Sequence, residues 1–469
     1  MVFSLDRPPI DAPPDPGTDM VTARFIRRQV EDEGAPFRDT QPQDVTASVV
    51  LENGARPLVE QEGDTFRFAW TRGMTYHLTF DRGQERSPLT FVANTEQLRH
   101  VQRTHGREGK LTQPGTRLDV TFENLGTAAL LGVVTTGVWS FWTDQVSTPL
   151  VLEWPLEVRF LGGRSQILEA RDSVYCLEYD EVIDSGLQYR AVSRWGKTSV
   201  TMDNGAVTTL ACTLVERPLE KCARIEIDRA AELARLDGLL APTFDTTSFA
   251  SFVLATPEAA YGPWASTWLA LQTGSGPITP FSGTLHYTNP FASSSEAVQS
   301  VMFRVRYVKA RGAMKAIPLP AGTSHFYRPT ENCGAVAPIA QIAVPSPPAF
   351  GGAFLVTDAE LQLSRTQPIH VSWETRTPGA VDYYLLQLYE LVLDPDTLAT
   401  VLVEKHAWVS TMQEMMLGRD TFEANREYVM SVSTLYGFVG TENGDFGTTR
   451  WPSPVASATN YSGVFTVKP

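Results

Sequence analysis

Two pairs of tryptophans have a spacing that could form a platform for sugar rings. Trp139 and Trp142 lie in GVWSFW, and Trp264 and Trp268 lie in YGPWASTW, both in segments bounded by Gly or Pro. Exposed, coplanar indole rings bind sugars through their flat apolar faces. These four residues therefore predict a carbohydrate-binding site, and packing of the rings into a protein core is the alternative.

Two loops carry oxygen ligands of the kind that calcium prefers. Glu442, Asn443 and Asp445 form one candidate site, and Asp394 with Asp396 in DPD forms the other. Proteins hold calcium with several carboxylate, amide and carbonyl oxygens. Neither loop has the regular acidic spacing of an EF-hand. We therefore expect no resident cofactor, with calcium as the one candidate ion.

Clustered carboxylates or histidines could support hydrolysis or hold zinc. A glycosidase needs two carboxylates that face one sugar. The nearest clusters are Glu178, Asp180 and Glu181 in CLEYDEV and Asp394 with Asp396 in DPD, and the outward face of a strand or a turn explains each more simply. His100 and His105 are flanked by arginines that repel a divalent cation, so a solvated basic connector is expected there. No motif for a catalytic serine, a zinc hydrolase or a phosphate-binding loop occurs, and we predict that the chain is not an enzyme.

The cysteines allow three pairings. A bridge between Cys212 and Cys222 is the expected one, because these residues end the segment ACTLVERPLEKC, where Arg217-Pro218 could turn the chain back. Cys176 and Cys333 would then form the second bridge. Four free, half-buried thiols are the alternative.

The composition excludes several classes of protein. The chain has 469 residues and a net charge of −14, so it offers no basic field for nucleic acid. Hydrophobic residues make up 42% and charged residues 20%, which is typical of a folded chain. No apolar run approaches the length of a membrane span. We expect neither a nucleic-acid partner nor a transmembrane segment.

Alternation of apolar and polar residues dominates the chain and predicts an all-β fold. Residues 65–80 alternate on both sides of Arg72-Gly73, which predicts a hairpin. Residues 197–214 predict a second hairpin, with Asn204-Gly205 in a type I′ turn. One helix is expected at 229–236, capped by Asp228 and ended by Gly238. Further strands are expected at 117–122, 150–154, 156–161, 174–179, 187–192, 248–254, 284–287 and 300–308.

Composition also divides the chain into five parts, which predicts tandem β-sandwich modules. Residues 1–20 form a Pro/Asp-rich tether, too poor in apolar residues to fold. A small β module at 21–95 is followed by sandwiches at 96–225, at 226–344 with the one helix, and at 345–469. A charged connector beginning at Arg99 separates the first two modules. The proline-rich IAVPSPPAFGG precedes the last module, because proline cannot donate a backbone hydrogen bond to a central strand.

The C-terminal part resembles a fibronectin type III domain. Trp373 ends IHVSW, where that family has the core Trp of its second strand, and Tyr428 in FEANREYVMSVSTLYG has the place of the family's corner tyrosine. Phe422 stands where the family usually has Leu. Residues 21–95 resemble small Ig-like or transthyretin-like modules of bacterial surface proteins. The Pro/Asp-rich leader resembles that of bacterial surface lipoproteins, without their lipidated cysteine.

These resemblances imply a protein that is secreted or held on the cell surface, including as an outer-membrane lipoprotein in its mature form. We expect a structural, adhesive or assembly role through contact with other protein subunits or surface components, and edge strands could provide such contacts. A surface protein that binds a glycan through the Trp pairs is the alternative. A glycan-active enzyme is the third hypothesis.

Overall fold

The computed structural model describes residues 18–29, 38–40, 45–82, 87–103, 113–127, 130–135, 140–144, 146, 148–153, 167–184, 187–227, 246–255, 267–274, 281–291, 297–311, 314–327, 333, 342–354, 359–361, 368–375, 379–393, 400–438, 440–446 and 455–467. Within these ranges the chain is built of strands, with two 3-10 helices, η2 (Arg419–Thr421) and η3 (Thr441–Asn443). The predicted all-β fold is confirmed. No helix in the described ranges is long and apolar enough to cross a membrane. The helix predicted at 229–236 and the strand predicted at 156–161 lie outside the described residues.

An 18-stranded sheet runs through the molecule. Short strands join it at the sides: β16 (Val215–Glu216) pairs with β14, β32 (Phe465–Val467) with β30, and β25 (Ala359–Leu361) with β32. The remaining strands, in the order in which neighbours are hydrogen-bonded, are β3 (Thr46–Leu51), β6 (Tyr76–Asp81), β7 (Leu89–Ala93), β28 (Thr400–Ser410), β27 (Tyr383–Leu393), β30 (Glu427–Tyr436), β31 (Val455–Tyr461), β22 (Met314–Tyr327), β21 (Ala297–Arg311), β18 (Thr246–Ala255), β19 (Thr267–Gly274), β14 (Leu187–Ser199), β13 (Ser173–Asp184), β10 (Leu130–Thr135) and β11 (Ser140–Thr143).

Four smaller sheets complete the sandwiches. The first contains β2 (Arg38–Thr40), β1 (Thr18–Gln29), β5 (Thr65–Thr71), β4 (Glu60–Glu62) and β8 (Gln97–Arg103). The second contains β12 (Leu150–Glu153), β9 (Arg117–Glu123) and β15 (Val207–Thr213). The third contains β17 (Lys221–Ile227) and β20 (Phe281–Tyr287), and the fourth contains β24 (Ala353–Phe354), β23 (Ala349–Phe350), β26 (Ile369–Ser372) and β29 (Glu414–Leu417).

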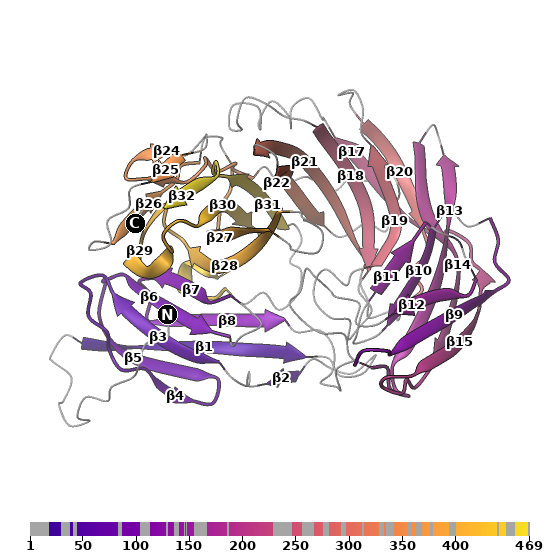
Figure 1. Ribbon diagram of the computed structural model, residues 1–469, viewed down its shortest axis with the longest axis horizontal. Coiled ribbons are helices and arrows are strands. Elements are labelled where there is room, and N and C mark those ends of the chain that lie inside the picture. Colours follow the sequence, from indigo (N-terminus) through magenta and orange to yellow (C-terminus); the bar gives the residue numbers. More distant parts are fainter. Residues whose placement is uncertain are drawn as a thin grey trace.

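We call β1–β8 the N-terminal module and β23–β32 the C-terminal module. Figure 1 shows the gold strands of the C-terminal module directly above the indigo and purple strands of the N-terminal module, at the left of the view, while β9–β15 lie at the right. The first and last modules are therefore neighbours in space. The composition suggested a row of separate modules joined by short linkers, whereas in the structure the first and last modules lie against each other.

Each smaller sheet shares a hydrophobic core with part of the long sheet. The alternating strands put one face of each sheet inward, so that rings such as Phe66, Phe80 and Phe91 lie in one core of the N-terminal module. A second core combines residues of β10, β13 and β14 with residues of β17 and β20, and it extends from Leu130 to Phe291. That core crosses the position at 225 where the sequence placed a boundary between modules.

The hairpin predicted at 65–80 is wrong, although both of its strands exist. β5 pairs with β1 and β4, whereas β6 pairs with β3 and β7 in the long sheet. The turn between them therefore carries the chain from one layer of the sandwich to the other. Phe66 and Phe68 of β5 and Tyr76 of β6 are almost completely buried in the same core. Alternation identified the inward face correctly but not the partner strand.

The second predicted hairpin, at 197–214, is wrong for the same reason. β14 belongs to the long sheet, and β15 pairs with β9 in the second smaller sheet. A turn does form at Asn204-Gly205, but only Gly205 has a left-handed backbone, with φ of +79°, so the turn is not type I′. Asn204 Oδ1 instead accepts hydrogen bonds from Gln113 N (2.7 Å) and Thr116 Oγ1 (2.9 Å), which fix β15 beside β9.

The C-terminal module has the strand arrangement of a fibronectin type III-like sandwich. β27 lies between β28 and β30 in one layer, and β26 lies between β23 and β29 in the other. Trp373 is 1% exposed between the layers. The hydroxyl oxygen of Tyr428 accepts a hydrogen bond from the backbone N–H of Glu423 (2.9 Å), and the Phe422 ring packs on the Tyr428 ring. These contacts agree with the resemblance seen in the sequence.

The proline-rich segment before this module is not an exposed linker. Residues 342–350 are buried against the C-terminal module. Ser346 N donates to Glu374 O (2.7 Å), and Asn460 Nδ2 donates to Pro345 O (3.0 Å). Proline lacks an N–H but keeps its carbonyl acceptor, so side chains can dock the segment where strand pairing cannot continue.

Candidate interaction sites

The structure bears on one of the four predicted sugar-stacking residues. The side chains of Trp139, Trp264 and Trp268 lie outside the described residues. Trp142 on β11 is half-buried and packs against the core formed by β10, β13 and β14. Its Nε1 donates a weak hydrogen bond to Tyr179 Oη (3.4 Å), and Gly132 leaves room for its ring, since a Cβ there would lie 3.0 Å from Trp142 Cδ1. Trp142 thus acts as a packing residue and not as an open platform.

The side chains of the predicted calcium loop, Glu442, Asn443 and Asp445, do not converge on one point as the ligands of a cation would. Glu442 and Asn443 are exposed in η3, and Asn443 Nδ2 donates to Glu442 Oε1 (3.1 Å). The carboxylate of Asp445 is bound by Arg99, with 3.1 Å between Nη1 and Oδ2. A cation here would have to displace that guanidinium. Among the residues that the structure describes, no three His, Cys, Asp or Glu are grouped to hold a metal ion, and Asp394 and Asp396 are not among them.

The acidic cluster on β13 binds β14 and the loop that follows β9. The Glu178 side chain is fully buried, and its carboxylate accepts two hydrogen bonds from the backbone N–H of Gly126 (2.9 and 3.0 Å). Arg194 Nη1 lies 3.5 Å from the same carboxylate. The other two acids accept hydrogen bonds from polar side chains: Asp180 from Thr127 and Glu181 from Gln188. These contacts stabilise the local fold, and they explain the acids without a catalytic role.

The predicted pairing of Cys212 with Cys222 is wrong. The disulfides join Cys176 to Cys212 and Cys222 to Cys333. The segment between Cys212 and Cys222 does not form a hairpin, because β15, β16 and β17 belong to three different sheets. Cys212 on β15 instead faces Cys176 on β13 across the core that the two strands share. The first disulfide therefore ties the two layers of one sandwich together.

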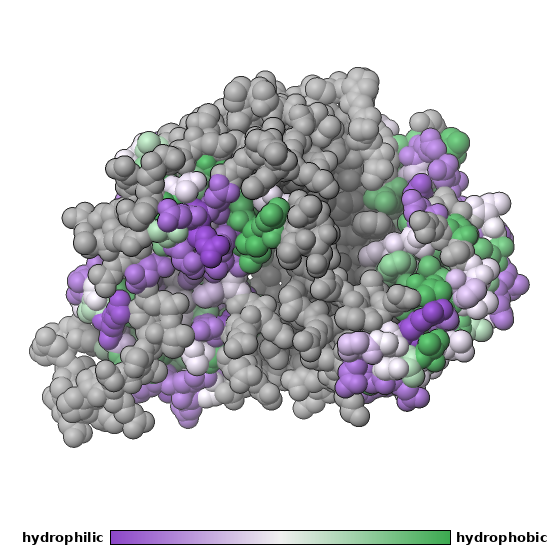
Figure 2. All heavy atoms as spheres, viewed as in Figure 1, coloured by the Kyte–Doolittle hydropathy of each residue, from purple (hydrophilic) through white to green (hydrophobic). Residues whose placement is uncertain are grey.

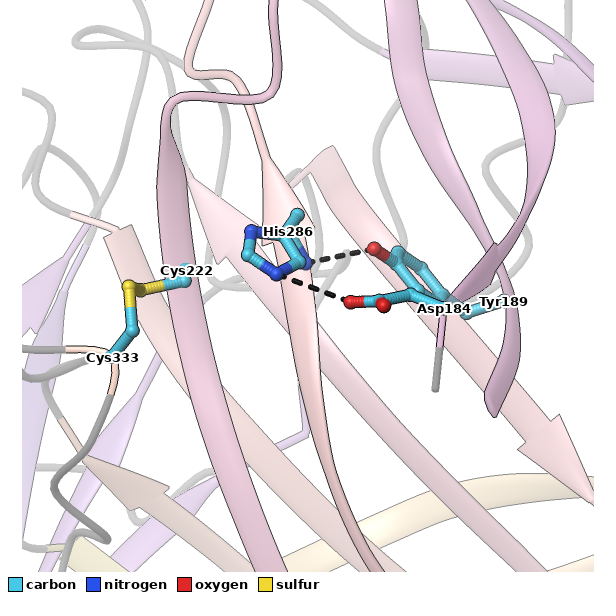
Figure 3. The surroundings of a disulfide bond; sticks show 5 residues. All are labelled: Asp184, Tyr189, Cys222, His286 and Cys333. Atoms are coloured by element: carbon cyan, nitrogen blue, oxygen red, sulfur yellow. Dashed lines mark hydrogen bonds and ion pairs between the residues drawn. A yellow bond between two sulfur atoms is a disulfide. The ribbon is translucent and has the colours of Figure 1, made fainter. Parts of the chain in front are cut away.

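A histidine and a carboxylate lie beside the second disulfide (Figure 3). His286 on β20 is the register partner of Cys222 on β17, and its Nε2 lies 3.2 Å from Asp184 Oδ2. The backbone N–H of His286 donates to Tyr189 Oη (2.9 Å). The side chains of His286 and Asp184 are each 38% exposed. The contacts of His286 with Asp184 and Tyr189 hold the ends of β13 and β14 to β20. The adjacent Cys222 sulfur is bound to Cys333, so it offers no thiol nucleophile.

The contact between the N-terminal and C-terminal modules joins strands that lie far apart in the sequence. β7 pairs in parallel with β28, from Leu89 beside Ala407 to Val92 beside Ser410. Ala407, Val409 and Phe446 enter the core of the N-terminal module. The first and last modules therefore share both a sheet and a core, and we call this contact the junction.

A second set of bonds at the junction connects β8 with the loop after β30. Arg99 N donates to Gly444 O (2.8 Å), and Phe446 N donates to Arg99 O (2.8 Å). The Phe446 ring lies 5.2 Å from the Phe91 ring, centroid to centroid. The stretch that the sequence assigned to a charged connector is thus, as far as Arg103, a strand of the N-terminal module. Its charged Arg99 faces Asp445, and its apolar neighbours face the core.

Two histidines are enclosed at the junction. His406 on β28 stacks on Trp408 at 4.2 Å, and its Nε2 shares a hydrogen bond of 2.7 Å with Thr90 Oγ1 on β7. His100 lies between the rings of Phe25 and Phe91, at 5.0 and 5.1 Å. Loss of hydration, assisted by the nearby Arg82 charge, lowers the pKa of each imidazole to about 3. The sequence predicted that His100 lies in solvent. In the structure it is enclosed by rings of β1 and β7, two strands whose positions the alternation of residues could not predict.

No protein-family model matches the chain, and no curated protein matches it. Solved structures to which it is similar include the FN1–FN3 domains of chicken CNTN1, at 10% identity, covering 94% of this chain and 98% of that one, with a TM-score of 0.14. A Streptococcal ancillary pilin has 8% identity, 65% and 95% coverage, and a TM-score of 0.14. Escherichia coli alpha-2-macroglobulin activated by porcine elastase has 10% identity, 96% and 44% coverage, and a TM-score of 0.15. The strand pairing described above is what defines an all-β protein of several sandwich modules.

Proposed function

We propose that this chain is a structural or adhesive protein of the cell surface or the secreted space, that it acts through protein–protein contact, and that it is not an enzyme. The observation that carries the proposal is the 18-stranded sheet. Modules on flexible linkers move relative to one another by default. Here the long sheet and the junction oppose such motion, which suits a rigid spacer or a building block of a larger assembly.

The cysteines support an extracytoplasmic location. All four are paired, in bridges that close sequence separations of 36 and 111 residues. Disulfides of this kind persist in oxidising compartments and are rare in the reducing cytosol. The structure places the last three residues of the predicted tether, Thr18–Met20, in β1. The Pro/Asp-rich residues before β1 would then serve as a tether that holds the folded part away from the surface, with a lipid anchor as one means of attachment.

The ionisable groups support a role without catalysis. Glu178, which could have served a hydrolase, is bound to a backbone N–H and an arginine, and Asp445 is bound to Arg99. Trp142 is half-buried and packs against its own core, so it gives no particular support to glycan binding.

Thiol labelling in the source organism tests the proposal. Denatured protein from the envelope or secreted fraction should show no thiol that reacts with a maleimide before reduction and four after it. In intact cells, a membrane-impermeant amine cross-linker should trap the chain in species larger than the monomer. Two outcomes would refute the proposed role. One is recovery of the chain from the cytosol with reactive thiols, and the other is the absence of any cross-linked species in intact cells.

A further inference from the structure

One edge of the described sheets lacks the features that usually keep strand edges apart. β15 is the last strand of the sheet β12–β9–β15. Leu214 N donates to Glu123 O and Arg117 N donates to Ala206 O, both at 3.0 Å, so the even-numbered residues of β15 are bonded to β9. The backbone N–H and C=O groups of Val207, Thr209 and Ala211 therefore point to the open side.

The open stretch ends before Thr213. A Cβ added to Gly196 of β14 would lie 2.3 Å from Thr213 O, so β14 covers that end of the strand. Five residues, from Val207 to Ala211, remain as a free edge in the described structure. Figure 1 shows β15 at the lower right, at the end of the molecule away from the junction.

The composition of this edge favours pairing with another strand. The stretch VTTLA carries no charge and no proline, and Val207 is 57% exposed. Exposed Glu60 and Glu62 protect the short edge strand β4. Neighbouring modules already cover both sides of the C-terminal module's sheet, β28 by β7 and β31 by β22. Figure 2 shows apolar and polar side chains intermingled over the end that contains β9–β15.

We propose that β15 pairs with β15 of a second copy of this chain, antiparallel and about a two-fold axis at Thr209. In that register Val207 of each copy lies opposite Ala211 of the other, and the two Thr209 residues face each other. The outward N–H and C=O groups of all three residues then meet in hydrogen-bonded pairs. Threonine pairs opposite each other stabilise antiparallel strands.

The register is self-complementary on both faces. On the inner side, Thr208 lies opposite Leu210 of the other copy, so the apolar face of each sheet continues into the next. On the outer side, the nearest charges in the central row are the Asp119 carboxylates of β9, roughly 14 Å apart at three strand spacings. Arg117 neutralises each of them, with 2.6 Å between Nε and Oδ1. No like charges come into contact.

This inference rests on the proposed role: the partner is a second copy of the chain, and the contact is the free edge of β15. Sedimentation of the full chain over a wide range of concentration should show a monomer–dimer equilibrium. Thr209→Lys places two lysines face to face on the axis and should weaken dimerisation roughly tenfold or more. Thr121→Lys is the matched control, because Thr121 is also exposed on the outer face of this sheet but lies on the central strand β9, and it should dimerise like the unchanged chain.

Two further measurements locate the contact. Thr209→Cys should form a disulfide-linked dimer under mild oxidation, since Cα atoms in a hydrogen-bonded antiparallel pair are about 5.5 Å apart, and Thr121→Cys should not. Amide exchange at the three outward N–H groups should slow as the concentration rises. A monomer at every concentration, or a dimer that Thr209→Lys leaves intact, would overturn the inference.

The two proposals fail separately. A chain that is oxidised and cross-linked at the cell surface, yet monomeric when purified, refutes the β15 contact and leaves the structural role in place. A reduced, cytosolic chain refutes the structural role whether or not it dimerises.

Discussion

Substitution of Gly444 by alanine should open the junction between the first and last modules. Gly444 has a left-handed backbone with φ of +80°, and a Cβ there would lie 1.9 Å from Gln97 O of β8. The carbonyl belongs to the main chain of a paired strand, so it cannot rotate away as a long side chain could. Gly440 in the same loop is the matched control: its φ is +98°, but a Cβ would lie 3.3 Å from Asp445 Cβ and would not touch β8.

The difference between the two variants can be worked out from these contacts. The left-handed conformation costs alanine about 1 kcal/mol in each variant. Gly444→Ala also forces the loop from β8, which breaks the bonds from Arg99 N to Gly444 O and from Phe446 N to Arg99 O. At about 1 kcal/mol for each bond, this variant should lose about 3 kcal/mol in total, against about 1 kcal/mol for Gly440→Ala.

Equilibrium unfolding in urea, followed by tryptophan fluorescence, measures both losses. Amide exchange at Arg99 and Phe446 reports separately on the junction, and it should accelerate in Gly444→Ala and not in Gly440→Ala. Equal losses of stability, with equal protection at these two amides, would refute the argument that the loop is held against β8 and that the two modules act as one unit.

Four further results are expected. Between about pH 6.5 and pH 5, the free energy of unfolding should fall by up to about 2 kcal/mol on account of His406, because the unfolded imidazole takes up a proton near its usual pKa of 6.5 while the folded one, with its pKa lowered to about 3, does not. His406→Gln should reduce this acid loss in urea unfolding, and an unreduced loss would contradict the argument. Tyr428→Phe should cost about 1 kcal/mol, since it removes the acceptor for Glu423 N, and an unchanged midpoint would contradict this account of the corner. Removal of the Cys176–Cys212 disulfide, which closes the shorter loop, by substitution of both cysteines with serine should lower the free energy of unfolding by about 4 kcal/mol. Peptide mapping without reduction should recover two linkages, Cys176–Cys212 and Cys222–Cys333. Any peptide that joins Cys212 to Cys222 would contradict the structure.

The sequence alone determined that the fold is all-β and which face of an alternating strand is buried. A period of two in apolar residues defines an inward face whatever strand lies alongside, and Phe66, Phe68 and Tyr76 are all inside as their spacing required. It also determined local features that depend on a few neighbouring residues. The corner formed by Tyr428 is of this kind.

Only the tertiary structure decided which strands pair, which cysteines meet and where one module gives way to the next. Backbone hydrogen bonds in a sheet are the same for almost any sequence, so alternation leaves the choice of partner open. That choice follows from the packing of cores between residues far apart in the chain, as where β7 meets β28 or Cys176 meets Cys212. For the same reason His100, which reads as a solvated residue among arginines, is enclosed by rings from strands that its own segment could not specify.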